Sequence, residues 1–292
     1  MPGPSNELIA RLAPAVFVFL WSTGFIGAKF GLPYAEPLTF LWVRMSMVVA
    51  ILALVVAVVR PPWPTRAEVG HSIVVGLLVH GFYLGGVFVA ISQGVPAGIS
   101  ALIPGLQPVL MATLANRWLG ERVTAWQWLG FALGVVGVFL VLNDRTIFGA
   151  GTPLGWAASV VSLLAITLGT IYQKRHGGAI DWRSGNLIQY AAVTLFFLCG
   201  ALLFETGGVR WTTQFILAMA WLVIVLSIFA VALMYWLIRR AAAANVASLF
   251  YLVPATTAFL AWLLFDEKLN ALALAGMVLC AGAVLIVTAR KT

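Results

Sequence analysis

Ten apolar segments, each ended by Pro, Gly or charged residues, account for most of this sequence. A helix of about 20 apolar residues crosses the ~30 Å hydrocarbon core of a bilayer. Lipid-exposed backbone must satisfy its own hydrogen bonds, so segments of this length are expected to be α-helices. The sequence therefore predicts an all-α membrane protein with ten transmembrane helices. The predicted spans are Leu12–Phe30, Pro37–Val59, Gly70–Ile91, Ala97–Leu119, Ala125–Leu142, Pro153–Gln173, Ser184–Phe204, Thr213–Ile238, Ala241–Phe265 and Ala271–Ala289.

The composition excludes most other classes of protein. Of the 292 residues, 62% are hydrophobic and 9% are charged, whereas a soluble domain carries about 25% charged residues. A soluble enzyme, a secreted disulfide scaffold, a disordered chain and a nucleic-acid-binding module are all disfavoured. Cys199 and Cys280 lie within apolar segments and lack a C-x-x-C spacing, which supports neither a disulfide framework nor a zinc site. We expect no metal and no other cofactor.

The positions of the basic residues predict the orientation. If the N-terminus is cytoplasmic, twelve of the 17 Lys and Arg residues fall on the cytoplasmic side. Four fall on the opposite side, and Arg44 lies inside a span. Lys and Arg concentrate in the cytoplasmic loops of membrane proteins. We therefore expect a multi-pass protein of a bacterial-type inner membrane with both termini in the cytoplasm.

The second half of the chain repeats the first at a shift of 146 residues, which predicts two domains, 1–146 and 147–292. Each half contains five predicted spans, and an odd number requires the second half to enter the membrane inverted. Inverted repeats are typical of secondary transporters, which bind substrate near the midplane between the repeats. The matched pairs include Ala101 with Ala247, Pro108 with Pro254, Glu121 with Glu267, Arg122 with Lys268, and Gly130 with Gly276.

These repeated residues resemble the EamA repeat of the drug/metabolite transporter superfamily, and the resemblance covers both halves. Within the family, the chain is most similar to exporters of aromatic amino acids. The resemblance implies a carrier of small molecules, and Asp266 replaces the usual Gly of the second repeat. The residues that carry it are Ile99-Ser100-Ala101-Leu102, Pro108, Leu119-Gly120-Glu121, Gly130 and Gly137 in the first half, and Ala247-Ser248-Leu249, Pro254, Phe265-Asp266-Glu267, Gly276 and Gly282 in the second.

Polar residues inside a membrane are costly, so those within the spans are candidate site residues. His80 lies midway along the third span, and Tyr83 follows it on the same helical face. Trp21 lies beside a small polar break in the first span. Arg44 is the deepest cation and could contact an anionic group. The alternatives are a structural hydrogen bond for His80, snorkelling or a helix-carbonyl bond for Arg44, and simple packing for Trp21.

The fourth and ninth spans contribute a second group of candidates. Asn245, Ser248 and Tyr251 follow one another at three-residue intervals and predict a polar stripe, and Gln107 lies in the matching region of the first half. Nearby prolines bend a helix and free its carbonyls, so Pro104, Pro108 and Pro254 are candidate hinges. Five polar residues that we place near cytoplasmic ends are interpreted as interfacial anchors: Tyr172, Gln173, Asn186, Gln189 and Tyr190.

The absence of any acid deep within the predicted spans bears on mechanism. Proton-coupled antiport of cationic drugs needs a buried carboxylate, so this class is disfavoured. The sequence predicts a transporter, not an enzyme, that exports small zwitterions, aromatic amino acids foremost, by alternating access without obligatory proton coupling. The alternatives are export of other metabolites or drugs with His80-linked proton coupling and, more remotely, an intramembrane enzyme. For a transporter, we expect a small-molecule substrate and the lipid bilayer as partners, and no nucleic acid. The oligomeric state stays open, and a monomer is compatible with the sequence.

Overall fold

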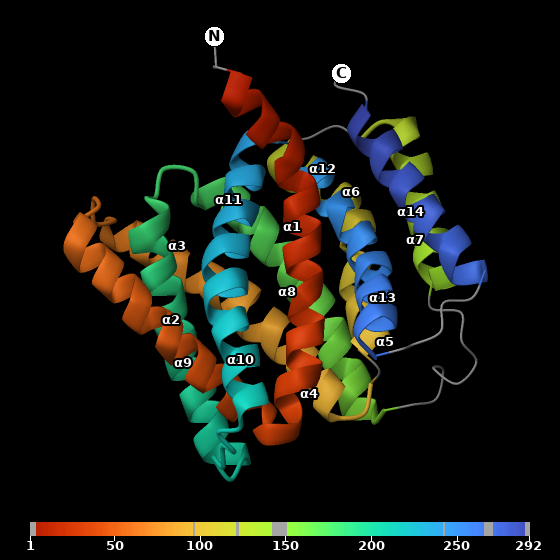
Figure 1. Ribbon diagram of the computed structural model, residues 1–292. Coiled ribbons are helices and arrows are strands. Elements are labelled where there is room, and N and C mark those ends of the chain that lie inside the picture. The colour runs from red at the N-terminus through yellow and green to blue at the C-terminus, as the bar shows by residue number, and fades with distance from the viewer. Residues whose placement is uncertain are drawn as a thin grey trace.

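The computed structural model describes residues 4–95, 97–120, 123–141, 151–241, 243–265 and 271–289 (Figure 1). In these ranges the secondary structure is helical, apart from an isolated bridge between Ala35 and Val209. The α-helices are α1 (Pro4–Gly31), α2 (Pro37–Val59), α3 (Arg66–Gly76), α4 (Tyr83–Ser92), α5 (Ala97–Gly105), α6 (Gln107–Leu119), α7 (Ala125–Val141), α8 (Pro153–His176), α9 (Trp182–Phe204), α10 (Thr213–Trp221), α11 (Val231–Arg240), α12 (Ala243–Ser248), α13 (Leu252–Phe265) and α14 (Ala271–Ala289). Four short segments are not α-helical: η1 (Leu32–Tyr34) and η4 (Leu249–Tyr251) are 3₁₀, and η2 (Leu77–Phe82) and η3 (Leu222–Ala230) are π-helical.

Every predicted span contains helix. By length and composition, seven helical stretches in the described residues can cross a membrane: Leu12–Tyr34, Pro37–Val59, Arg66–Ser92, Pro153–His176, Trp182–Phe204, Thr213–Arg240 and Asn245–Leu264. The fourth, fifth and tenth predicted spans contain shorter apolar helices, Ile103–Leu114, Ala125–Leu140 and Leu274–Val287. The helical fold class is therefore confirmed, and the number of crossings stays a prediction. In Figure 1, α1 begins and α14 ends at the same end of the bundle.

Helices that hold the same place in the two halves pack against each other. α2 lies along α9, and α7 lies along α14 at one edge of the bundle (Figure 1). The amides of Leu38 and Thr39, at the start of α2, donate to Glu205, directly after α9, at 2.7 and 2.6 Å. At the other end of this pair, the Ser184 hydroxyl donates to the Pro62 carbonyl at 3.0 Å. The two helices of this pair therefore run antiparallel.

The α7–α14 pair is also antiparallel. A Cβ atom built on Gly130 would meet Val287, whereas one built on Gly137 would meet the Gly276 carbonyl at 2.8 Å. The two glycines let the helix backbones approach closely, as small residues do between membrane helices. The predicted partners Glu121, Arg122, Asp266, Glu267 and Lys268, and the predicted domain boundary at 146/147, lie outside the described residues.

Matching helices are also interrupted at matching positions. In the third helical unit of each half, a π-helical segment separates two α-helices, η2 in the first half and η3 in the second. In the fourth unit, α5 ends at Gly105 and α6 begins at Gln107, between Pro104 and Pro108. The equivalent unit has η4 between α12 and α13, and Pro254 lies in the first turn of α13. The helix breaks occur where the prolines remove backbone donors.

Substitution of two glycines of α3 would test how closely this helix packs against α9. A Cβ atom at Gly76 would lie 2.7 Å from the Gln189 carbonyl oxygen and 2.8 Å from its Cα, whereas Gly70 has open space around it. We expect Gly76→Ala to lower the free energy of unfolding by about 1–3 kcal/mol through overpacking. Gly70→Ala on the same helix should raise it by about 0.5–1 kcal/mol. Thermal unfolding in detergent measures both, and equal effects would contradict the close α3–α9 contact.

Candidate functional site

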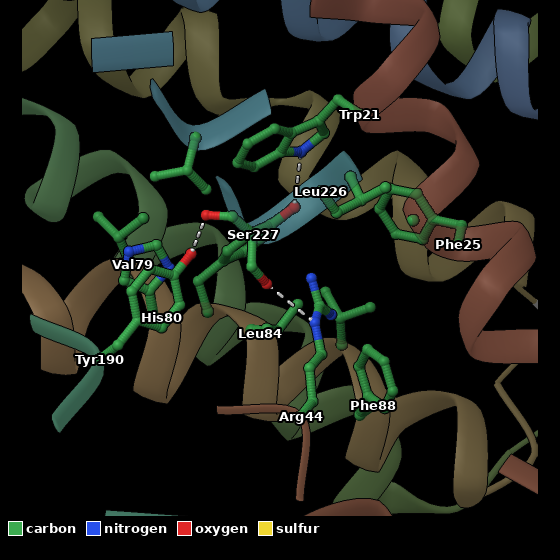
Figure 2. A pocket seen from close by; sticks show the side chains of 14 residues that line it. Trp21, Phe25, Arg44, Val79, His80, Leu84, Phe88, Tyr190, Leu226 and Ser227 are labelled. Atoms are coloured by element: carbon green, nitrogen blue, oxygen red, sulfur yellow. Dashed lines mark hydrogen bonds between the residues drawn. The ribbon is translucent and has the colours of Figure 1, made fainter. Parts of the chain in front are cut away.

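A small cavity lies in the middle of the bundle between the two π-helical segments (Figure 2). Its volume is about 40 Å³, room for roughly three water molecules at ~10–15 Å³ each. Besides η2 and η3, it is lined by α1, α2, α4, α9 and the start of α11. The lining residues are Trp21, Gly24, Phe25, Arg44, Val79, His80, Tyr83, Leu84, Val87, Phe88, Tyr190, Leu226, Ser227 and Val231. Four of the predicted site residues, Trp21, Arg44, His80 and Tyr83, thus meet in one place.

The π-helical segments put a polar side chain on each side of the cavity. A π turn adds one residue to the helix and rotates the residues that follow, and such turns are frequent at functional sites. η2 carries His80 and η3 carries Ser227, both buried. Because η2 and η3 occupy equivalent places in the two halves, the cavity lies where the halves meet.

Arg44 of α2 points into the cavity and is only 4% exposed (Figure 2). Its Nε donates to the Ser227 hydroxyl at 3.1 Å, and the Tyr190 hydroxyl donates to the Ser227 carbonyl at 2.7 Å. Among the described residues, no carboxylate lies within ion-pair distance of Arg44. The side chain does not snorkel to a membrane surface. A buried cation without a counter-ion carries a large desolvation penalty, which an anionic ligand would offset.

His80 is held between two tyrosines. Its ring stacks on Tyr190, with centroids 4.4 Å apart and planes at 20°. The Tyr235 hydroxyl donates to Gln189 Oε1 at 2.8 Å and lies 3.4 Å from His80 Nε2. Since the Tyr235 proton is used on Gln189, its oxygen is left to accept from Nε2–H, which fixes the tautomer of a neutral His80. His80 therefore both faces the cavity and bonds to α11.

Aromatic rings form the other side of the cavity. Trp21 Nε1 donates to the Tyr83 hydroxyl at 3.0 Å, and the two rings are nearly parallel with centroids 6.2 Å apart. Phe17 and Phe250 pack against Trp21 at 5.1 and 5.6 Å. Such packing holds the indole in place. The cavity therefore combines one cation and a few hydroxyls with a rigid aromatic surface.

The remaining predicted site residues lie elsewhere and do not line this cavity. Gln107 donates to the Thr170 hydroxyl of α8 at 3.1 Å. Tyr251 donates to the Phe131 carbonyl of α7 at 2.9 Å. Ser248 donates to the Asn245 carbonyl at 2.8 Å, and the Asn245 side chain accepts from Gln127 at 3.4 Å. Tyr251 ends the 3₁₀ segment η4, and its hydroxyl is directed to α7 instead of the cavity.

Two polar residues of the cavity, Ser227 and Tyr190, escaped sequence reasoning. Ser227 lies in a long apolar run, and only its place in the repeat, opposite Gly81 and next to the position of His80, could have singled it out. Tyr190 was interpreted as an interfacial anchor together with Gln173, Asn186 and Gln189. That interpretation is wrong for these four residues, since all are buried inside the bundle. The signal missed for Tyr190 was its depth, more than two turns into α9.

Within the described ranges, no group of three His, Cys, Asp or Glu side chains is close enough to hold a metal ion. Cys280 is buried and Cys199 is exposed, and both are free thiols.

Comparisons with known proteins now connect this fold and site to a family. The sequence matches the EamA-like transporter family twice, over residues 9–143 and 153–289. It is 26% identical to "Uncharacterized transporter YvbV" of Bacillus subtilis over 95% of this chain and 90% of that protein. It is 27% identical to a "Probable amino-acid metabolite efflux pump" of Escherichia coli, over 90% of this chain and 89% of the relative.

Two further comparisons agree. "Uncharacterized inner membrane transporter YedA" of Escherichia coli is 24% identical over 93% of this chain and 88% of its own length. A protein crystal structure superposes with a TM-score of 0.76 at 20% identity, covering 95% of this chain and 96% of the other, which supports the fold. Both predicted halves match the same family, so the internal repeat is confirmed. The chain belongs to the EamA-like transporter family of membrane transport proteins.

Proposed function

We propose that this protein exports small zwitterions, aromatic amino acids foremost, across a bacterial-type inner membrane. The observation that carries the proposal is Arg44, a buried cation without an acidic partner among the described residues, inside a cavity walled by aromatic rings. The name of the Escherichia coli relative, "Probable amino-acid metabolite efflux pump", supports export of amino-acid metabolites in general.

The chemistry of the cavity suits an aromatic amino acid. Its carboxylate would bind the Arg44 guanidinium and the Ser227 hydroxyl through charge-assisted hydrogen bonds. The rings of Trp21, Tyr83 and Phe88 would pack on its side chain, which aromatic pairs favour. Its ammonium group would find acceptors in the Ser227 carbonyl and the Tyr190 hydroxyl. Arg44 repels cations, which disfavours cationic drugs as substrates.

Transport requires the cavity to change size. At about 40 Å³ it has room for a few water molecules and not for an amino acid, so this conformation is closed around the site. In alternating access, two halves rock about a fixed site and expose it to one side at a time. The antiparallel α2–α9 and α7–α14 pairs and the matched π-helical segments support two inverted repeats, 1–146 and 147–292. Ten crossings with cytoplasmic termini complete this arrangement.

Pro104, Pro108 and Pro254 would serve as the hinges. They flank two helix breaks that lie next to each other. A Cβ atom built on Gly105 would lie 3.2 Å from the Pro254 ring. A hinge is a few element-terminal residues that absorb a change in backbone angles. The breaks at Leu106 and η4 meet this description.

Counterflow in reconstituted vesicles tests the function. Vesicles preloaded with unlabelled phenylalanine should accumulate labelled phenylalanine at equal pH inside and out, because no Asp or Glu is among the residues that line the cavity. Leucine, benzoate and a cationic dye compete in parallel assays and report the substrate class. Absence of counterflow for every amino acid would contradict the proposal.

The His80–Tyr235–Gln189 chain favours one specific alternative. His80 is connected through the Tyr235 hydroxyl of α11 to Gln189 of α9. A histidine at the site with this connection could take up a proton during transport. The same vesicles with an imposed pH gradient separate the two mechanisms. Accumulation that requires the gradient and disappears in His80→Gln would establish coupling and overturn the uncoupled model.

A further inference from the structure

A large groove lies on the outside of the bundle between α1 and the η3–α11 unit. Its volume is about 780 Å³, far larger than the central cavity. Val16 and Leu20 of α1 form one wall, and Phe229 and Leu233 form the other. Phe229 is 61% exposed and Val16 is 45% exposed, so this surface faces the lipid in a membrane. The groove is long and apolar, as an acyl chain requires.

One end of the groove is strongly basic. Arg239 and Arg240, the last residues of α11, are exposed and line it. The Arg240 guanidinium lies 4.2 Å from the centre of the Trp236 ring, a cation–π contact that holds the charge at the rim. Arg239 donates through Nη2 to the carbonyls of Gly177 and Ile180, at 2.9 and 2.5 Å.

Among the side chains that the structure describes, no acid pairs with these charges at the rim. Asp181, which lines a neighbouring pocket together with Arg239, is already paired with Arg183 at 2.8 Å. Hydrogen bonding to Arg183 lowers the pKa of the Asp181 carboxyl, so Asp181 stays ionised and engaged. Trp182 also lines the groove at this end, where an indole suits the boundary between headgroups and acyl chains. The groove therefore joins a basic rim to an apolar channel through an interfacial tryptophan.

We propose that this groove is a binding site for an anionic phospholipid. The lipid phosphate would bind the Arg240 guanidinium and the free edge of Arg239, and one acyl chain would lie along Val16, Leu20 and Leu233. Basic pockets between membrane helices select acidic headgroups in this way. Two adjacent arginines, with no carboxylate paired to them in the described part of the chain, discriminate against a zwitterionic lipid, whose own ammonium group neutralises its phosphate.

One side chain connects the groove to the central site. Tyr235 lines the groove and also donates to Gln189 beside His80. A bound acyl chain would pack on the Tyr235 ring and limit its movement. The binding proposal itself does not depend on what the protein transports.

Lipid titration of the purified protein tests the proposal. In detergent, phosphatidylglycerol should bind at least tenfold more tightly than phosphatidylcholine by native mass spectrometry, about the value of one charge-assisted bond. Arg240→Gln should remove most of that preference, and Arg240→Lys should restore part of it. Ala232→Trp should block the channel and weaken binding of both lipids without any change of charge.

Arg60→Gln is the matched control, because Arg60 is an exposed basic residue after α2 that does not line the groove. It should leave the preference for phosphatidylglycerol unchanged. Equal affinity of the wild type for the two lipids would overturn the proposal. An equal loss of preference in Arg60→Gln and Arg240→Gln would also overturn it, since the effect would then be one of net charge.

Discussion

Replacing Arg44 with Met is expected to abolish phenylalanine counterflow while leaving the protein folded. Arg44 is the only buried cation that the structure places in the cavity, and it has Ser227 as its hydrogen-bond partner there. Loss of a buried charge-assisted contact to a carboxylate costs about 3 kcal/mol. The initial rate at limiting substrate should therefore fall about 100-fold.

The stability of the same variant separates a binding role from a structural one. An arginine buried without a counter-ion is destabilising, and an apolar side chain of similar length relieves the desolvation penalty. The midpoint of thermal unfolding in detergent should therefore equal or exceed that of the wild type. Added phenylalanine should raise the midpoint of the wild type and not that of Arg44→Met, because a ligand stabilises only the state that binds it.

Two further variants serve as controls. Arg44→Lys keeps the charge but loses the planar donor set, so it should recover part of the rate. Arg60→Met at the end of the same helix should transport at the wild-type rate. Near-normal counterflow by Arg44→Met would remove Arg44 from the site, and a marked drop in its unfolding temperature would indicate a structural role instead.

The sequence predicted the fold well because lipid leaves few choices to the backbone. Each apolar window contains helix, and α8 (Pro153–His176) and α9 (Trp182–Phe204) differ only at one end from the predicted windows, Pro153–Gln173 and Ser184–Phe204. The repeat was also visible, since Pro, Gly and acidic residues recur in one register. For the site, the rule that deep polar side chains are unusual brought out His80 and Arg44, and both reach the cavity.

The direction of side chains after a helix irregularity could not be predicted. An α-helical spacing puts Asn245, Ser248 and Tyr251 on one stripe, but the 3₁₀ segment η4 changes the rotation per residue. Ser227 reaches Arg44 because the π-helical η3 changes it in the opposite sense. Pro254 marks the break after η4, but the π-helical segments η2 and η3 contain no proline, so no local sequence signal reveals them.

A pair of reciprocal contacts closes the bundle at the end that the charge distribution assigns to the cytoplasm. Lys174, near the end of α8, donates to the carbonyls of Ile238, at 2.8 Å, and of Ala241. In return, Arg239 of α11 donates to the carbonyls of Gly177 and Ile180. Each basic side chain thus satisfies free carbonyls at or beyond the end of the other helix. Both helices belong to the second half, and we expect them to move apart within that half when the site opens toward this end, which would break these contacts.

Cross-linking across this closure is therefore expected to stop transport. In a Cys199→Ser background, Lys174→Cys with Ala241→Cys puts thiols on both sides, within the reach of a lysine side chain. A reversible methanethiosulfonate linker of that length should reduce phenylalanine counterflow to the rate of empty vesicles. A reductant that cleaves the linker should restore counterflow, so each sample provides its own reference without the cross-link.

The control pair carries the same linker without joining the two helices. Lys174→Cys with Gly178→Cys places both thiols on α8 and the loop that follows it, and Gly178 has open space around it. This pair should react equally well and should transport as before. If counterflow continues in the Lys174→Cys/Ala241→Cys protein with its cross-link verified by mass, α8 and α11 do not separate during the cycle. The opening at this end would then lie between other helices.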